Sequence, residues 1–131
     1  MSADDNTSMH NDHFIKILVA DDSKTERTHL RQVLLSGGYE VITADSGQAA
    51  LEIIDTEIPD LILLDIIMEN GDGYQTCRTL KKNPSTKNIP VIMLSSKSND
   101  VDRKWAMKLG ASDYITKPYN DDELLQRLSA L

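Results

Sequence analysis

Short apolar runs alternate along this chain with longer stretches in which apolar residues recur every three or four positions. The runs cover residues 15–20, 41–44, 61–64, 91–94 and 114–116. Nearly continuous runs of this length are typical of strands that are buried on both faces of a parallel sheet. The second and last runs are less apolar, so we expect them nearer to the edges of the sheet.

The stretches between the runs have the spacing of amphipathic helices. Apolar residues share a helical face in three of them: Leu30, Val33 and Leu34; Ala50, Ile53 and Ile54; and Leu124, Leu125, Leu128 and Leu131. Ser23 and Glu26 have the spacing of a capping box, in which each side chain bonds to the other residue's backbone N–H. Asn120 and Glu123 resemble this arrangement at the start of the last helix.

Five strands that alternate with five helices predict one α/β domain, with a parallel sheet covered on both faces. A length of 131 residues fits one domain, and an apolar content of 40% is enough for a core. Residues 1–13 are polar and have little to bury. They are predicted to form a flexible tail in front of a domain at residues 14–131.

Charge argues against several classes of partner. The formal net charge is −7, whereas nucleic acid and anionic lipid both require a basic surface.

No apolar stretch approaches the roughly 18 residues of a membrane span, so no membrane insertion is expected. The polar N-terminus lacks the pattern of a signal peptide, and the single cysteine, Cys77, excludes an internal disulfide. We therefore expect a cytoplasmic protein.

Residues with candidate chemistry follow the apolar runs. Asp21 and Asp22 come after the first run, Asp65 after the third, Ser95 after the fourth and Lys117 after the fifth. In open α/β sheets, the carboxyl ends of the strands form the edge at which ligands bind. Three carboxylates, a hydroxyl and an ammonium group are therefore predicted to meet there.

Such a cluster favours phosphoryl chemistry beside a metal ion. Three close carboxylates repel one another unless a cation neutralises them, and their oxygens suit Mg²⁺ or Mn²⁺. A lysine can pair with phosphate oxygens, and a carboxylate beside a metal can attack phosphorus to give an aspartyl phosphate. A lone aspartate after a strand is more often a helix cap, as Asp22 could also be, but caps do not explain the whole set.

Four segments resemble those of a known family. They are VADDS at residues 19–23, LLDI at 63–66, PVIMLSS at 90–96 and GASDYITKP at 110–118. In order and spacing they resemble the hallmark segments of response-regulator receiver domains, the CheY-like proteins of two-component signalling. The resemblance runs over residues 14–131. It implies a flavodoxin-like, doubly wound sheet of five parallel strands in the order 2-1-3-4-5, with five helices.

The resemblance implies a role for each site residue. Asp65 would be the phosphoacceptor, with a histidine kinase as the donor of the phosphoryl group. Mg²⁺ would be bound directly by Asp22, by Asp65 and by the backbone carbonyl of Ile67, and through water by Asp21. Lys117 would contact the phosphoryl group.

The resemblance also implies a switch. Ser95 would contact the phosphoryl group as the switch hydroxyl, and the ring of Tyr114 would turn inward as Ser95 moves toward the phosphate. The peptide bond between Lys117 and Pro118 is expected to be cis. The signal would pass to a protein target on the face formed by the fourth helix, fifth strand and fifth helix. Trp105 lies in that fourth helix, either as part of the core or as a contact for the target.

Three residues near the site affect the expected behaviour. Glu69 stands where many receivers have proline, and it adds a negative charge close to the site. Ile67 and Lys97 occupy two flanking positions that influence how water reaches the phosphoaspartate in this family. Because the side chain of Ile67 cannot orient an attacking water, we expect a long-lived phosphorylated state. Residues 105–118 are most similar to the PilH group of receivers, from type IV pilus motility and phototaxis systems.

Other functions fit the sequence less well. Phosphatases of the haloacid dehalogenase type have a second aspartate two residues after the nucleophile, where this chain has Ile67, so turnover of outside substrates is not expected. A flavodoxin-like FMN carrier needs a phosphate-binding loop after the first strand, where Asp21 and Asp22 would repel phosphate. A phosphate sink for the kinase and a phosphorylation-independent binding module stay open as alternatives.

Overall fold

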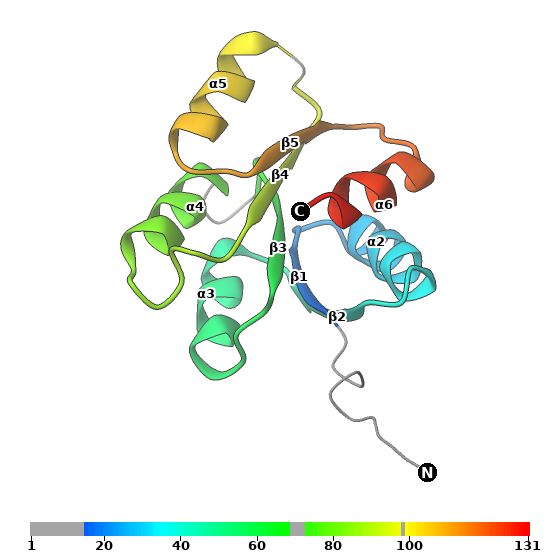
Figure 1. Cartoon of the computed structure of the whole chain (residues 1–131), viewed down its shortest axis with the longest axis horizontal. Helices are drawn as coiled ribbons and strands as arrows, with labels where there is room; N and C mark the ends of the chain where they lie inside the picture. The colour runs from blue at the N-terminus through cyan, green and yellow to red at the C-terminus, as the bar shows by residue number, and fades with distance from the viewer. Residues whose placement is uncertain (1–14, 69–72, 98) are drawn as a thin grey trace.

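The computed structural model describes residues 15–68, 73–97 and 99–131. Strands and helices alternate as predicted (Figure 1): β1 (Lys16–Ala20), α2 (Lys24–Ser36), β2 (Glu40–Ala44), α3 (Gly47–Thr56), β3 (Leu61–Asp65), α4 (Gly73–Lys82), β4 (Val91–Ser95), α5 (Asp100–Lys108), β5 (Asp113–Thr116) and α6 (Asp121–Ser129). The predicted tail and Glu69 lie outside the described residues.

The five strands form one parallel sheet in the order β2-β1-β3-β4-β5, which confirms the predicted fold class. The central strands β3 and β4 are buried along their whole length. The edge strands β2 and β5 are only partly buried, as their weaker apolar runs predicted. Helices α2 and α6 cover one face of the sheet, and α3, α4 and α5 cover the other (Figure 1).

Alternation along the strands supplies a separate core to each face, because successive side chains of a strand point to opposite sides. In β1, for example, Ile17 and Val19 pack against α2 and α6. Leu18 and Ala20 belong to the core beneath the other three helices. Both cores exclude water from the sheet, so its carboxyl edge is a rigid support for polar side chains.

Side chains cap the helices that begin beside this edge. Ser23 accepts a hydrogen bond from the backbone N–H of Glu26 at 3.3 Å, which is one half of the predicted capping box. The second bond of the box, from the Ser23 N–H to the Glu26 side chain, is not formed. The Ser23 N–H donates instead to Asp21 Oδ1 at 2.9 Å, and the Glu26 carboxylate pairs with Lys117. Leu131, predicted on the apolar face of the last helix, lies beyond α6 and is 55% exposed.

Candidate functional site

Three aspartates meet at the carboxyl edge of the sheet, as the sequence predicted. Asp21 and Asp22 follow β1, and Asp65 ends the neighbouring strand β3. One carboxylate oxygen from each of the three lies within 4.8 Å of the others. Asp21 and Asp65 are buried, whereas Asp22 is exposed, so the cluster is open to solvent on one side.

Hydrogen bonds fix the orientation of the two buried aspartates. The Oδ1 atom of Asp21 accepts from the Ser23 N–H, and Arg27 donates from its guanidinium to the Asp21 backbone carbonyl at 2.8 Å. The N–H of Ile67 donates to Asp65 Oδ1 at 3.3 Å. These bonds leave the second oxygen of each carboxylate directed at the cluster and at Lys117.

Lys117 reaches the cluster from the end of β5. Its Nζ atom lies 3.2 Å from Asp21 Oδ2, 3.4 Å from Glu26 Oε1 and 3.8 Å from Asp65 Oδ2. The N–H of Lys117 donates to the Ser95 carbonyl at 2.7 Å, and the peptide bond to Pro118 is cis, as predicted. Sequence reasoning missed Glu26 as a site residue, because its spacing from Ser23 already had a local explanation as a helix cap.

The electrostatics of the cluster favour binding of a cation. Burial raises the pKa of Asp65 to about 6, together with the negative charges of Asp21 and Asp22 and against the opposing effect of Lys117 and the Ile67 N–H. Burial alone would lower the pKa of Lys117, but the surrounding carboxylates raise it. Among the described residues, the Lys117 ammonium thus faces an excess of carboxylates. Hard oxygen ligands in such excess suit a divalent ion such as Mg²⁺.

The predicted switch residues are connected through one backbone position. Ser95 is buried at the end of β4, and its Oγ accepts a hydrogen bond from the Lys97 N–H at 3.0 Å. Tyr114 is also buried, and its hydroxyl donates to the Lys97 carbonyl at 2.7 Å. The guanidinium of Arg103 lies 5.2 Å from the centre of the Tyr114 ring. In this structure the ring is therefore already inside, and its movement on switching stays a prediction.

The two positions expected to tune the lifetime are both exposed. The side chain of Ile67 is 53% exposed, two residues beyond Asp65. The side chain of Lys97 is exposed as well, two residues beyond Ser95. Ile67 follows β3 and Lys97 follows β4, so both lie at the carboxyl edge of the sheet, and their influence on the lifetime stays a prediction.

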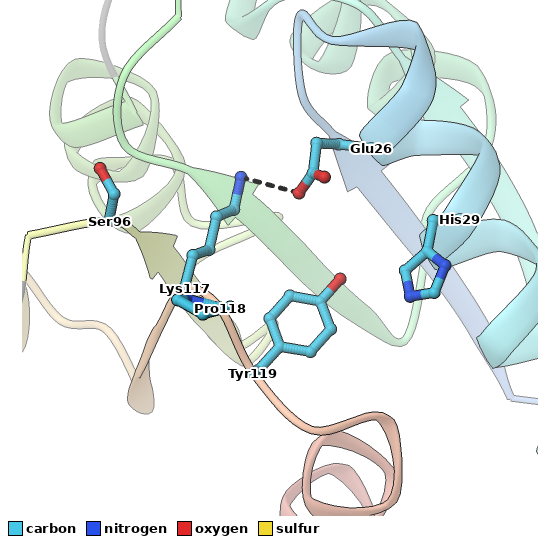
Figure 2. A pocket seen from close by; sticks show the side chains of 6 residues that line it. All are labelled: Glu26, His29, Ser96, Lys117, Pro118 and Tyr119. Atoms are coloured by element: carbon cyan, nitrogen blue, oxygen red, sulfur yellow. Dashed lines mark ion pairs between the residues drawn. The ribbon is translucent and has the colours of Figure 1, made fainter.

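A cavity of about 410 Å³ adjoins the site on the side of α2 and α6. Its lining consists of Glu26, His29, Ser96, Lys117, Pro118 and Tyr119 (Figure 2). The dashed line in the figure marks the ion pair between two of these lining residues, Lys117 and Glu26. No helix in the described part of the chain is long and apolar enough to cross a membrane.

Comparison with known proteins agrees with this geometry. Residues 17–129 match the response regulator receiver domain. The chain is 37% identical to the protein PilH of Pseudomonas aeruginosa, over 88% of this chain and 96% of PilH. It is 43% identical to PilG of the same organism, over 88% of this chain and 86% of PilG. The structure of the chemotaxis protein CheY4 of Vibrio cholerae superimposes with a TM-score of 0.86 at 28% identity, covering 90% of this chain and 98% of CheY4.

The fold and the acidic edge together define a CheY-like signalling module. The chain belongs to the family of response regulator receiver domains, and it is similar to PilH and PilG. Receiver domains interact with histidine kinases and bind Mg²⁺ in an acidic pocket, and the aspartate cluster is a pocket of that kind.

Proposed function

We propose that Asp65 accepts a phosphoryl group from the phosphohistidine of a histidine kinase, and that this modification switches the protein. The position of Asp65 carries the proposal, because its carboxylate belongs to the three-aspartate cluster and also lies 3.8 Å from the Lys117 ammonium. An acceptor of this kind must stand beside groups that neutralise the incoming phosphoryl oxygens.

The proposed step is an in-line displacement at phosphorus. An oxygen of Asp65 forms the new O–P bond while the P–N bond to the donor imidazole breaks, and the electron pair leaves with the imidazole nitrogen. Lys117 and the Ser95 hydroxyl contact the transferred oxygens, with Lys117 supplying positive charge. Asp21, Asp22, Asp65 and the Ile67 carbonyl would hold Mg²⁺ or Mn²⁺, which would neutralise charge on the phosphoryl group when bound.

The proposed output runs from Ser95 to the face formed by α5, β5 and α6. Ser95 and Tyr114 both bond to the backbone of Lys97, so a movement of the Ser95 hydroxyl toward phosphate changes the support of the Tyr114 hydroxyl. On the same region of the surface, Trp105 is 40% exposed on α5. We propose that a protein target docks on this face and senses the change.

The proposed pathway is pilus-based motility or taxis, in the cytosol. The similarity to PilH and PilG supports it, together with the resemblance of residues 105–118 to the PilH group. The proposal includes no turnover of an outside substrate, because Ile67 stands where a phosphatase of the haloacid dehalogenase type needs a second carboxylate.

The test is incubation with acetyl phosphate and Mg²⁺, followed by measurement of the intact mass. We expect wild type to gain one phosphoryl group, and to gain none when EDTA replaces Mg²⁺. Asp65→Asn should gain none, whereas Asp55→Asn, at an exposed position on α3, should behave as wild type. An unmodified wild-type protein would contradict the proposal.

A further inference from the structure

The carboxylate of Glu26 forms an ion pair with Lys117 and does not cap its own helix. In a capping box, this side chain would return to the Ser23 N–H, but Asp21 already accepts from that group. Glu26 instead lies 3.4 Å from Lys117 Nζ, and its side chain is 38% exposed. Asp21 and Asp65 belong to the proposed metal site, and Glu26 does not. Its charge therefore stays available to Lys117 when the cluster holds a cation.

The Glu26 carboxylate and a phosphoryl group on Asp65 would compete for the ammonium group of Lys117. Its Nζ atom is closer to Glu26 than to Asp65, at 3.4 Å against 3.8 Å. A phosphoryl group would add strong acceptor oxygens to Asp65, whose Oδ2 lies 3.8 Å from the ammonium, and charge-assisted bonds to phosphate are strong. The ion pair with Glu26 thus opposes the movement of Lys117 toward that group.

The Tyr119 hydroxyl is a second potential hydrogen-bond donor to Glu26. The hydroxyl of Tyr119 is buried and has no hydrogen-bond partner among the described residues, and an unpaired buried hydroxyl is costly. Figure 2 shows this hydroxyl directed toward α2, from which Glu26 and His29 project into the cavity. His29 is hydrogen-bonded to Asp121 at 3.0 Å, so the carboxylate of Asp121 is already engaged.

We propose that Glu26 is a positioning residue that exchanges partners: it holds Lys117 before phosphorylation and accepts from the Tyr119 hydroxyl when Lys117 turns to the phosphoryl group. The cavity of about 410 Å³ gives the Glu26 side chain room to rotate without repacking of the core. This inference rests on the proposed function of Asp65. It adds a residue pair that sets how readily Lys117 leaves its resting position.

The affinity for beryllofluoride in the presence of Mg²⁺ tests the exchange, since this ion mimics a phosphoryl group on aspartate. Glu26→Gln should tighten binding about two- to fivefold, because an opposing ion pair is lost. Glu26→Asp should behave similarly, because the shorter side chain does not reach Lys117. Glu52→Gln removes the same charge from an exposed position on α3 and should bind as wild type.

Tyr119→Phe supplies the second half of the test. It removes only the hydroxyl, so it should weaken beryllofluoride binding about twofold in wild type and have no effect in a Glu26→Ala background, which lacks a side-chain acceptor. In the metal-free protein, the side-chain ¹⁵N signal of Lys117 should shift in Glu26→Gln and not in Glu52→Gln. Such a shift reports the resting contact without any phosphoryl chemistry.

The outcomes separate two kinds of failure. If wild type binds no beryllofluoride with Mg²⁺, both the proposed phosphoryl site and the exchange are wrong. If wild type binds and Glu26→Gln or Glu26→Asp binds no more tightly, only the exchange is wrong. An equal effect of Tyr119→Phe in both backgrounds would likewise overturn the role of Tyr119 as the second partner of Glu26.

Discussion

The hydroxyl of Tyr114 donates a hydrogen bond to the backbone carbonyl of Lys97 at 2.7 Å. The N–H of the same Lys97 donates to Ser95 Oγ at 3.0 Å. One peptide segment after β4 therefore connects a hydroxyl beside the acidic cluster to an aromatic ring in the next strand. Arg103 lies over that ring from α5, so the contact extends to the helix on the proposed output face.

We expect Tyr114→Phe to destabilise the protein by about 1–2 kcal/mol. The ring stays in place, but the partly buried hydrogen bond from its hydroxyl to the Lys97 carbonyl is lost, and such a bond typically contributes about 1 kcal/mol. Urea unfolding checks the value, with Tyr39→Phe as the control because the Tyr39 hydroxyl makes no hydrogen bond within the described residues. Equal stability of Tyr114→Phe and wild type would show that the hydrogen bond contributes little.

Asp65 should oppose folding of the metal-free protein at neutral pH. The pKa of Asp65 is raised from 3.8 to about 6, so between these values the folded state binds a proton that the unfolded chain releases. Stability from this group is therefore present at low pH and is lost as the pH rises through about 6. In EDTA, Asp65→Asn should be more stable than wild type by about 1–3 kcal/mol at neutral pH.

The gain from Asp65→Asn should shrink as the pH falls from about 6 toward 3.8 and be gone below it, where the wild-type carboxyl is protonated in both states. Urea unfolding at a series of pH values measures the difference between the two proteins. Asp55→Asn, at an exposed position, is the control for the loss of one charge. A gain that does not depend on pH would show that the charge of Asp65 is not its cause.

Mg²⁺ should raise the melting temperature of wild type by several degrees. An ion that binds only the folded state stabilises it in proportion to the logarithm of its concentration above the dissociation constant. The gain should be lost in Asp22→Asn, which removes one of the three clustered carboxylates, and kept in Asp55→Asn. A shift of the same size in Asp22→Asn would place the ion elsewhere.

Most of the fold was predictable because it depends on local pattern. The apolar runs fall on the strands to within one residue at either end, and the edge strands are those with the weaker runs. Strand order is a long-range property, and it came from the family resemblance. Leu131 was misplaced because a helical period alone does not say where a helix ends.

The sequence predicts those site residues whose positions follow from the backbone topology. Asp21, Asp65 and Lys117 meet because the strands of a parallel sheet end at the same edge. Glu26 and Arg103 reach the site through side-chain conformation, which a one-dimensional pattern does not encode. Glu26 does not cap its helix because Asp21 already accepts from the Ser23 N–H, and the spacing of Ser23 and Glu26 does not encode that competing bond.

Ile67→Asn should shorten the lifetime of the phosphorylated protein. Ile67 is exposed beside Asp65 and has no group that can orient water, whereas an amide can hold water near the phosphorus. Loss of the phosphoryl group, followed by mass after removal of acetyl phosphate, measures the lifetime. Ile58→Asn is the matched control, because Ile58 is 59% exposed and lies between α3 and β3. Equal lifetimes of wild type and Ile67→Asn would contradict the role of Ile67.

The central claim is that Asp65 itself carries the phosphoryl group. Treatment of the phosphorylated protein with borohydride reduces an aspartyl phosphate to homoserine, and peptide mass mapping then locates the changed residue. We expect homoserine at position 65 and unmodified aspartate at positions 21 and 22, with no conversion when EDTA replaces Mg²⁺. Homoserine at position 21 or 22, or conversion at several aspartates without preference for position 65, would contradict the account.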